Sequence, residues 1–252
     1  MQLMKALALT GKEMVCFVGG GGKTSLMLKL ARECAGSGKK VLITTSTKMY
    51  RRQLSALAEP VVERDKNMLL GRLKALLSTG STAAAAAALA EDDKVIGLSG
   101  DRLDFIYRRG LFDYILVEAD GARGKSLKAP GKHEPVLPSA STTVIPVTGV
   151  DILGCPLAEE YVHRSHLAAE IAGQNTGSVI TERTVQKIIW HYISIISSVS
   201  GRSKIVPVIN KADSSELIKR AVQTAVPLLN EKIKKVLVTS VLPPYYLGEV
   251  MQ

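Results

Sequence analysis

The chain has 252 residues, 46% of them hydrophobic, which is enough to bury the core of one large α/β domain and excludes small disulfide-stapled scaffolds and disordered chains. Lysine and arginine outnumber aspartate and glutamate by 33 to 23, and this net charge of +10 favours anionic ligands such as nucleotides. Aromatic residues make up only 4% of the chain, too few to stack bases, so we expect no nucleic-acid partner.

The first predicted unit is a strand, a glycine loop and a helix. Residues 14–18 form a short apolar run that enters four glycines, and apolar residues then recur at helical spacing as far as Cys34. A β-branched run over residues 41–45 predicts the next strand. We therefore expect a β-α-β unit in which the two strands pair in parallel through a right-handed crossover.

The middle of the chain is less regular. Leucines on one face predict a helix over residues 68–77, whereas the alanine run 83–88 stays open, because alanine is the best helix former but the run leads towards the extended residues 94–97. Residues 114–117 and 143–147 are predicted to be buried strands. The long proline-bearing stretch between these two strands has no apolar period, and loops of that length are usually functional.

The last third alternates again between helix and strand. Apolar positions over residues 181–199 describe one long helix, and strands at 205–209 and 236–238 flank a helix at 217–225. Short apolar strands that alternate with helices, without an internal repeat, are typical of a doubly wound, mostly parallel sheet with helices on both faces. The sequence thus predicts a three-layer α/β fold.

We expect a single domain over residues 1–252, with an irregular basic loop at about 121–140. The three cysteines form no C-x-x-C pair and predict neither a disulfide framework nor a zinc site: Cys16, Cys34 and Cys155. The start of the chain lacks the layout of a cleavable signal, and no segment reaches the roughly 20 apolar residues of a membrane span. We therefore expect a cytoplasmic protein without a membrane partner.

The strongest motif follows the first strand and opens the first helix: Gly19, Gly20, Gly21, Gly22, Lys23, Thr24 and Ser25. Glycines let successive backbone N–H groups curl around an oxyanion, and the helix N-terminus adds a favourable dipole. As a phosphate-binding loop of the P-loop NTPase type, it would bring Lys23 to the β- and γ-phosphates and the Thr24 hydroxyl to Mg²⁺. The loop departs from G-x-x-x-x-G-K-[ST] at Phe17, and the alternative is a glycine-rich turn with a chance Lys-Thr pair.

Two acids follow the strand at 114–117, namely Glu118 and Asp120. Mg²⁺ takes hard oxygen ligands, and acids two residues apart on an extended chain face the same side. Either acid could therefore serve the metal, and the alternative is a solvated pair at a strand end. With Lys23 and the nearby Arg123, which could offset transition-state charge, these acids complete the predicted catalytic set.

Asn210, Lys211 and Asp213 follow the strand at 205–209 and match the N-K-x-D pattern by which GTPases read guanine. A carboxylate accepts two hydrogen bonds from guanine N1 and N2, which adenine does not offer, while the lysine stem covers the base. The alternative is that Asp213 caps the next helix, before Ser214. With the glycine-loop residues, these three form the predicted nucleotide-binding set, and they favour GTP over ATP.

Two further segments are candidates for contact with a substrate: Thr45, Thr47 and Lys48 after the second strand, and Lys128, His133 and Glu134 in the basic loop. The first segment leaves its strand at the carboxyl edge of the sheet, where ligands of such folds bind, and its alternative is an ordinary turn. The second suits an anionic ligand, and its alternative is a solvated loop.

Several of these strings together resemble the YqeC family, accessory proteins of selenium-dependent molybdenum hydroxylases: F-V-G-G-G-G-K-T-S, T-T-S-T-K-M, V-E-A-D-G-A-R, L-K-A-P-G-K-H-E-P-V, Y-V-H-R and V-I-N-K-A-D. They run in this order across nearly the whole chain, and the string from Leu127 to Val136 is the most specific. The resemblance implies a cytoplasmic P-loop nucleotide-binding protein that serves the maturation of a molybdenum hydroxylase or its selenium-containing cofactor. The similar layout of the metal-insertion GTPases favours an accessory GTPase.

The sequence therefore predicts a Mg²⁺-dependent nucleoside triphosphatase, with GTP favoured over ATP, whose hydrolysis gates delivery of a cofactor or labile group to an apo-enzyme. One alternative is a P-loop kinase or nucleotidyl transferase that acts on a small anionic acceptor. Another is a non-catalytic module whose binding is gated by nucleotide. The acceptor, the client protein and the oligomeric state stay open, with a homodimer as one option.

Overall fold

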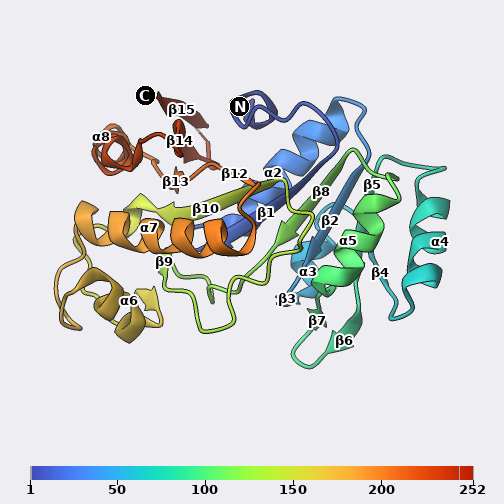
Figure 1. Ribbon diagram of the computed structural model, residues 1–252, viewed down its shortest axis with the longest axis horizontal. Helices are drawn as coiled ribbons and strands as arrows, with labels where there is room; N and C mark the ends of the chain where they lie inside the picture. Colours follow the sequence, from blue (N-terminus) through green and yellow to red (C-terminus); the bar gives the residue numbers. More distant parts are fainter. Residues whose placement is uncertain (1, 244, 252) are drawn as a thin grey trace.

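The computed structural model describes residues 2–243 and 245–251, and its centre is a ten-stranded sheet (Figure 1). Its strands are β1 (Glu13–Gly19), β2 (Val41–Thr45), β4 (Pro60–Val62), β5 (Thr82–Ala86), β8 (Tyr114–Glu118), β10 (Thr143–Gly149), β12 (Lys204–Ile205), β13 (Val208–Asn210), β14 (Lys235–Ser240) and β15 (Tyr246–Met251). They lie in the order β15-β14-β13-β10-β1-β8-β2-β5-β4, with β12 also beside β10.

Neighbouring strands of this sheet run parallel except for β14 and β15, which are antiparallel. The predicted fold class, a mostly parallel sheet with helices on both faces, is confirmed. The predicted pairing of the first two strands is wrong, because β8 lies between β1 and β2. A β-α-β crossover fixes the direction of its strands but can skip a position, and a strand from much later in the chain fills the gap.

Side chains of β1 alternate between the two faces of the sheet. Met14, Cys16 and Val18 join the core cluster on one face, and Val15 and Phe17 join the cluster on the other. The first face is covered by α4 (Lys66–Leu76), α5 (Gly100–Arg108), α7 (Glu182–Val199) and α8 (Ser215–Ala225), with α6 (Ser165–Ala172) against α7 (Figure 1). The second is covered by α1 (Leu3–Ala6), α2 (Lys23–Gly36) and α3 (Arg51–Leu54).

The alanine run that the sequence left open forms strands. Residues 83–86 are fully buried in β5, between β2 and β4, and β6 (Ala88–Ala90) pairs with β7 (Lys94–Ile96) and β7 with β3 (Lys48–Tyr50) in a small second sheet. Burial between two strands outweighs the helix propensity of alanine, which is only a weak prior. The strand predicted at 205–209 is split into β12 and β13, because Pro207 has no N–H to give to the ladder.

The loop predicted at about 121–140 contains β9 (Leu127–Lys128), which pairs with β11 (Val162–His163). Two 3-10 turns, η1 (Val150–Ile152) and η2 (Val226–Leu228), follow β10 and α8.

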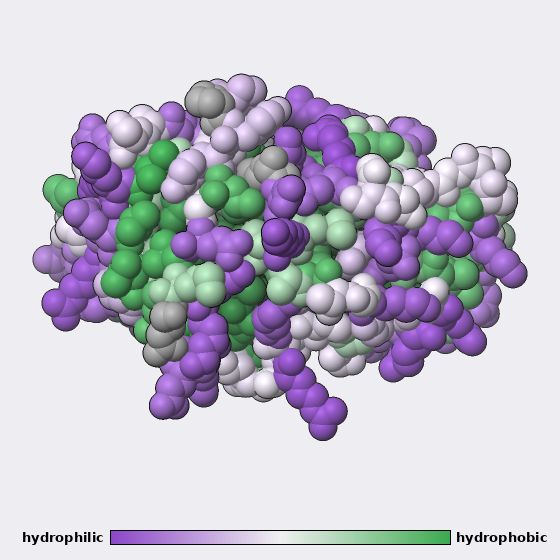
Figure 2. Space-filling view, turned by 90° about the horizontal axis from the view of Figure 1, so that it is seen from above, coloured by the Kyte–Doolittle hydropathy of each residue, from purple (hydrophilic) through white to green (hydrophobic). Residues whose placement is uncertain are grey.

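On the face seen from above, hydrophobic residues gather on the side where Figure 1 places α8, and hydrophilic and hydrophobic residues are mixed over the remainder (Figure 2). Leu217, Ile218 and Val222 of α8 are partly buried and pack against the core.

Among the described residues, no helix combines the length and the apolar character that a membrane crossing requires.

Candidate functional site

The glycine loop joins β1 to α2 at the carboxyl edge of the sheet, and close packing excludes side chains from it. Gly21 has a φ of +70°, and a Cβ there would overlap the backbone of Gly149. A Cβ on Gly20 would stand 2.8 Å from the carbonyl oxygen of Lys125. The glycines therefore allow two other backbone segments to lie directly against the loop, in addition to giving it its curvature.

Three amides of the loop donate to acceptors within the protein: Gly19 N to both carboxylate oxygens of Asp120 at 3.1 and 2.9 Å, Gly20 N to Val147 O at 2.9 Å, and Gly21 N to Lys125 O at 2.9 Å. Within residues 2–243 and 245–251, the amides of Lys23, Thr24 and Ser25 in the first turn of α2 have no such acceptor. The start of the helix thus presents the unused donors expected of an anion site.

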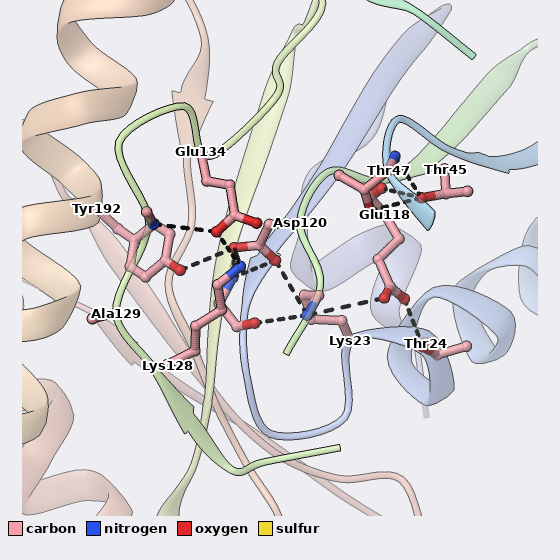
Figure 3. A network of polar contacts seen from close by, with 12 residues as sticks. Lys23, Thr24, Thr45, Thr47, Glu118, Asp120, Lys128, Ala129, Glu134 and Tyr192 are labelled. Carbon is pink, nitrogen blue, oxygen red and sulfur yellow. Dashed lines mark hydrogen bonds and ion pairs between the residues drawn. The ribbon is translucent and has the colours of Figure 1, made fainter. Parts of the chain in front are cut away.

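Lys23 is folded back inside the loop (Figure 3). Its side chain is only 4% exposed, and its Nζ donates to Gly19 O at 2.6 Å. The same Nζ lies 3.2 Å from Asp120 Oδ1 and 4.0 Å from Glu118 Oε1. The predicted phosphate-binding cation is therefore held between the loop and the two acids at the end of β8.

Glu118 lies beside Thr24 and the end of β2. The Thr24 hydroxyl donates to Glu118 Oε2 at 2.6 Å, and the Thr45 hydroxyl donates to the Glu118 carbonyl oxygen at 2.8 Å. Thr47 also lies close by, with its hydroxyl 3.3 Å from that of Thr45 (Figure 3). Burial raises the pKa of Glu118, and Lys23 and Thr24 offset this effect only in part.

Asp120 occupies a different environment, fully buried among donors and cations. It accepts the Tyr192 hydroxyl at 2.9 Å and the amide of Gly19, and its carboxylate contacts both Lys23 and Lys128, the latter at 3.0 Å. Burial and the Asp120 carboxylate raise the pKa of Tyr192 well above its usual value. The sequence pattern predicted that either acid could serve the metal, but the structure places them in different surroundings. Glu118 lies beside the Thr24 hydroxyl, and Asp120 lies beside Lys23 and Lys128.

The basic loop does not present all of its charges to solvent. Lys128 is fully buried, with its Nζ 3.0 Å from Asp120 Oδ2 and 2.7 Å from Glu134 Oε2. Glu134 also accepts from Arg164 Nη1 at 2.6 Å and from the amide of Gly131 at 3.2 Å. Burial by itself would raise the pKa of Glu134, but hydrogen bonds from Arg164 and Lys128 lower it to about 2. Lys128 was expected to face a substrate, but its side chain is buried and paired with Asp120 and Glu134, whereas Glu134 is only partly buried and also pairs with Arg164.

The other candidates for contact with an anion remain accessible. Arg123 is exposed at a φ of +49°, and Lys48 and His133 are also exposed.

Asn210 links the N-K-x-D segment to the glycine loop. Its side chain is fully buried, donates from Nδ2 to Gly21 O at 2.7 Å, and accepts from the Thr239 hydroxyl at 2.8 Å. Its neighbour Lys211 has a φ of +62° and donates to the Ser126 hydroxyl at 2.6 Å. The motif thus lies directly against the predicted phosphate site.

Asp213 is exposed at the same edge, and its Oδ1 accepts from the Ser240 hydroxyl at 2.5 Å. The alternative of a helix cap is wrong, because the N-cap of α8 is Ser214, whose hydroxyl accepts from Leu217 N at 3.2 Å. The Asp213 carboxylate is therefore fixed by Ser240 and does not cap the helix.

Four residues of this region were absent from the predicted set: Ser126, Asp151, Arg164 and Tyr192. Tyr192 lies within the predicted helix 181–199, where a tyrosine among apolar positions gives no separate signal for its hydroxyl. Asp151 carried one usable signal, since it follows a buried strand at the carboxyl edge of the sheet, where ligands bind.

Comparison with known proteins identifies relatives of the chain. Residues 15–166 match the family model described as YqeC protein. The protein YqeC of Escherichia coli (strain K12) is 35% identical over 203 residues, which cover 80% of this chain and 77% of that protein. The structure of chloroplast FtsY from Physcomitrella patens matches over 90% of this chain and 59% of its own, at 15% sequence identity and a TM-score of 0.43.

Proposed function

The chain belongs to the YqeC family, and we propose that it is a Mg²⁺-dependent nucleoside triphosphatase that binds its nucleotide at the glycine loop and favours GTP over ATP. The observation that carries the proposal is the position of Lys23, buried at the start of α2 and next to the hydrogen-bonded pair of Thr24 and Glu118. Cation, hydroxyl and carboxylate stand together where a helix presents unused amides.

The triphosphate would take the free amides of the first turn of α2 and the ammonium of Lys23. Because Lys23 now lies on Gly19 O and Asp120, it would have to turn from them to the phosphates. Lys128 contacts the same carboxylate and would keep Asp120 paired after that movement.

Thr24 and Glu118 fit Mg²⁺, since a hydroxyl and a carboxylate oxygen only 2.6 Å apart are hard ligands at one point. In the part of the chain that the structure describes, no group of three or more His, Cys, Asp or Glu side chains could hold a metal by itself. This agrees with a cation that one or two protein oxygens share with the phosphates. When bound, Mg²⁺ would offset the charge that develops on the transferred phosphoryl group.

For the base, we propose that Asp213 accepts from guanine N1 and N2 while Ser240 fixes its carboxylate. Asn210 would connect the base-reading segment to the loop through Gly21 O.

The alternative reaction, transfer of a phosphoryl or nucleotidyl group to a small anionic acceptor, has less support. Lys128, a candidate to bind that acceptor, is buried and already paired with two carboxylates.

From the family resemblance we propose that hydrolysis serves maturation of, or cofactor insertion into, a selenium-dependent molybdenum hydroxylase. Deletion of the gene in its host should then leave this hydroxylase as inactive apo-protein while its polypeptide level is unchanged. Full hydroxylase activity in the deletion strain would contradict this role and leave the proposed nucleotide chemistry intact.

Nucleotide binding is tested by titrating the purified protein with fluorescent GTP and ATP in the presence of Mg²⁺. Lys23→Ala should lose most of the binding, whereas Lys12→Ala should keep it, because Lys12 donates to Gly110 O beyond the opposite end of β1. Equal and negligible binding by the wild type and Lys23→Ala would refute the proposal. Phosphate release that depends on Mg²⁺ would then separate a triphosphatase from a module that only binds.

A further inference from the structure

A short segment after β8 lies across the glycine loop. Residues 122–126, called the strap here, place the carbonyl oxygen of Lys125 2.9 Å from Gly21 N and that of Ser126 2.9 Å from Gly149 N. Lys125 Nζ is also bonded to the carbonyl oxygen of Glu160. An N–H group has one hydrogen to donate, so the Gly21 amide cannot serve the strap and a phosphate oxygen together.

Three side chains, called the latch here, hold the strap in that position. The Ser126 hydroxyl donates to Asp151 Oδ2 at 3.0 Å, and Lys211 Nζ donates to the Ser126 hydroxyl at 2.6 Å and to Asp151 Oδ2 at 2.8 Å. Asp151 follows β10, whereas Lys211 belongs to the N-K-x-D segment. The latch thus ties the lysine expected to cover the base to the segment that accepts from the Gly21 amide of the glycine loop.

We propose that Asp151 is a positioning residue that opposes nucleotide binding, because it holds both Lys211 and the strap in the arrangement that excludes a nucleoside triphosphate. This inference rests on the proposed function. A triphosphate would take the Gly21 amide, and its base would draw the stem of Lys211 away from Asp151. Binding would then break the latch and release the strap, and the lost contacts would reduce the affinity.

The test is calorimetric titration with the non-hydrolysable β,γ-imido analogue of GTP and Mg²⁺. Asp151→Asn keeps the shape of the side chain but removes its charge, and we expect the analogue to bind about three- to ten-fold more tightly, as expected for losing partly exposed, charge-assisted hydrogen bonds. Ser126→Ala should change the affinity in the same direction. A merely structural role would weaken binding instead.

Glu182→Gln is the matched control. In the wild type, Glu182 pairs with Arg220, and these side chains are 30% and 31% exposed, close to the 40% and 33% of Asp151 and Lys211. The Glu182–Arg220 pair joins α7 to α8 and does not contact the strap. Its affinity for the analogue should equal that of the wild type. An affinity of Asp151→Asn equal to or below the wild-type value overturns the inference. If the wild type and Asp151→Asn both fail to bind, the proposed function fails and this inference falls with it.

Hydrogen exchange of the wild type gives a second measurement that needs no variant. The Gly149 amide is protected by Ser126 O of the strap, so saturation with the analogue should speed its exchange. Unchanged protection of Gly149 at saturation would show that the strap stays in place, and it would overturn the inference while leaving nucleotide binding established.

Discussion

Replacing Glu134 by glutamine should change how the stability of this protein depends on acid. Hydrogen bonds from Arg164 and Lys128 lower the pKa of this carboxyl from the usual 4.5 to about 2. At about 1.4 kcal/mol for each pKa unit, this shift corresponds to roughly 3 kcal/mol of folding free energy. The side chain is 18% exposed, so solvent screens the interaction only in part.

The sign follows from which state binds the proton first. The unfolded chain takes up a proton on Glu134 near pH 4.5, whereas the folded protein does so only near pH 2. The stabilisation is therefore fully present above about pH 4.5 and is lost as the pH falls towards 2. In Glu134→Gln this contribution is absent at every pH, and Lys128 keeps Asp120 as its one carboxylate partner among the described residues.

The assay is urea unfolding of the wild type and Glu134→Gln at a series of pH values from 7 to 2.5. The variant should be less stable at pH 7 by about 3 kcal/mol or more, and the gap should narrow as the pH falls below about 4.5. Glu59→Gln is the control, since Glu59 is 63% exposed and its pair with Arg51 is screened by water, so its gap should be near zero throughout. A gap for Glu134→Gln that stays constant across the series would refute the reasoning.

Three further predictions concern the loop and the base-reading segment. Asp213→Asn should exchange a preference for GTP for one for xanthosine triphosphate, measured by competition binding, and an unchanged guanine preference would show that Asp213 does not read the base. Asn210→Ala leaves Gly21 O without its buried donor, so denaturant titrations should show a free energy of unfolding lower by about 1–3 kcal/mol. The nucleotide affinity should fall as well, and a variant that binds nucleotide as tightly as the wild type would contradict the link between Asn210 and the loop. Gly21→Ala would force a Cβ into the backbone of Gly149 at a positive φ, so thermal unfolding should show a large loss of stability, and a wild-type melting temperature would contradict this packing.

The separation of Glu118 from Asp120 shows where sequence reasoning stopped. Glu118 is the last residue of β8 and Asp120 follows two residues later, a spacing that predicts side chains on the same side, so spacing alone could not distinguish them. Their environments differ because Thr24 lies against one of them, whereas Lys128 and Tyr192 reach the other from β9 and α7. The burial of Lys128 was missed for the same reason, since a lysine in a polar, proline-bearing stretch is usually solvated.

The sequence by itself determined the features that depend on neighbours along the chain. Apolar periodicity predicted the α/β class, the contiguous glycine run predicted a strand-loop-helix phosphate site, and the N-K-x-D string marked a second segment at the same edge. Tertiary structure alone decided the place of β8 between β1 and β2, the burial of Lys128, and the position of the strap held by Asp151 over Gly21. These features arise from contacts between residues far apart in the chain, and the side chains involved carry no local pattern that would indicate their partners.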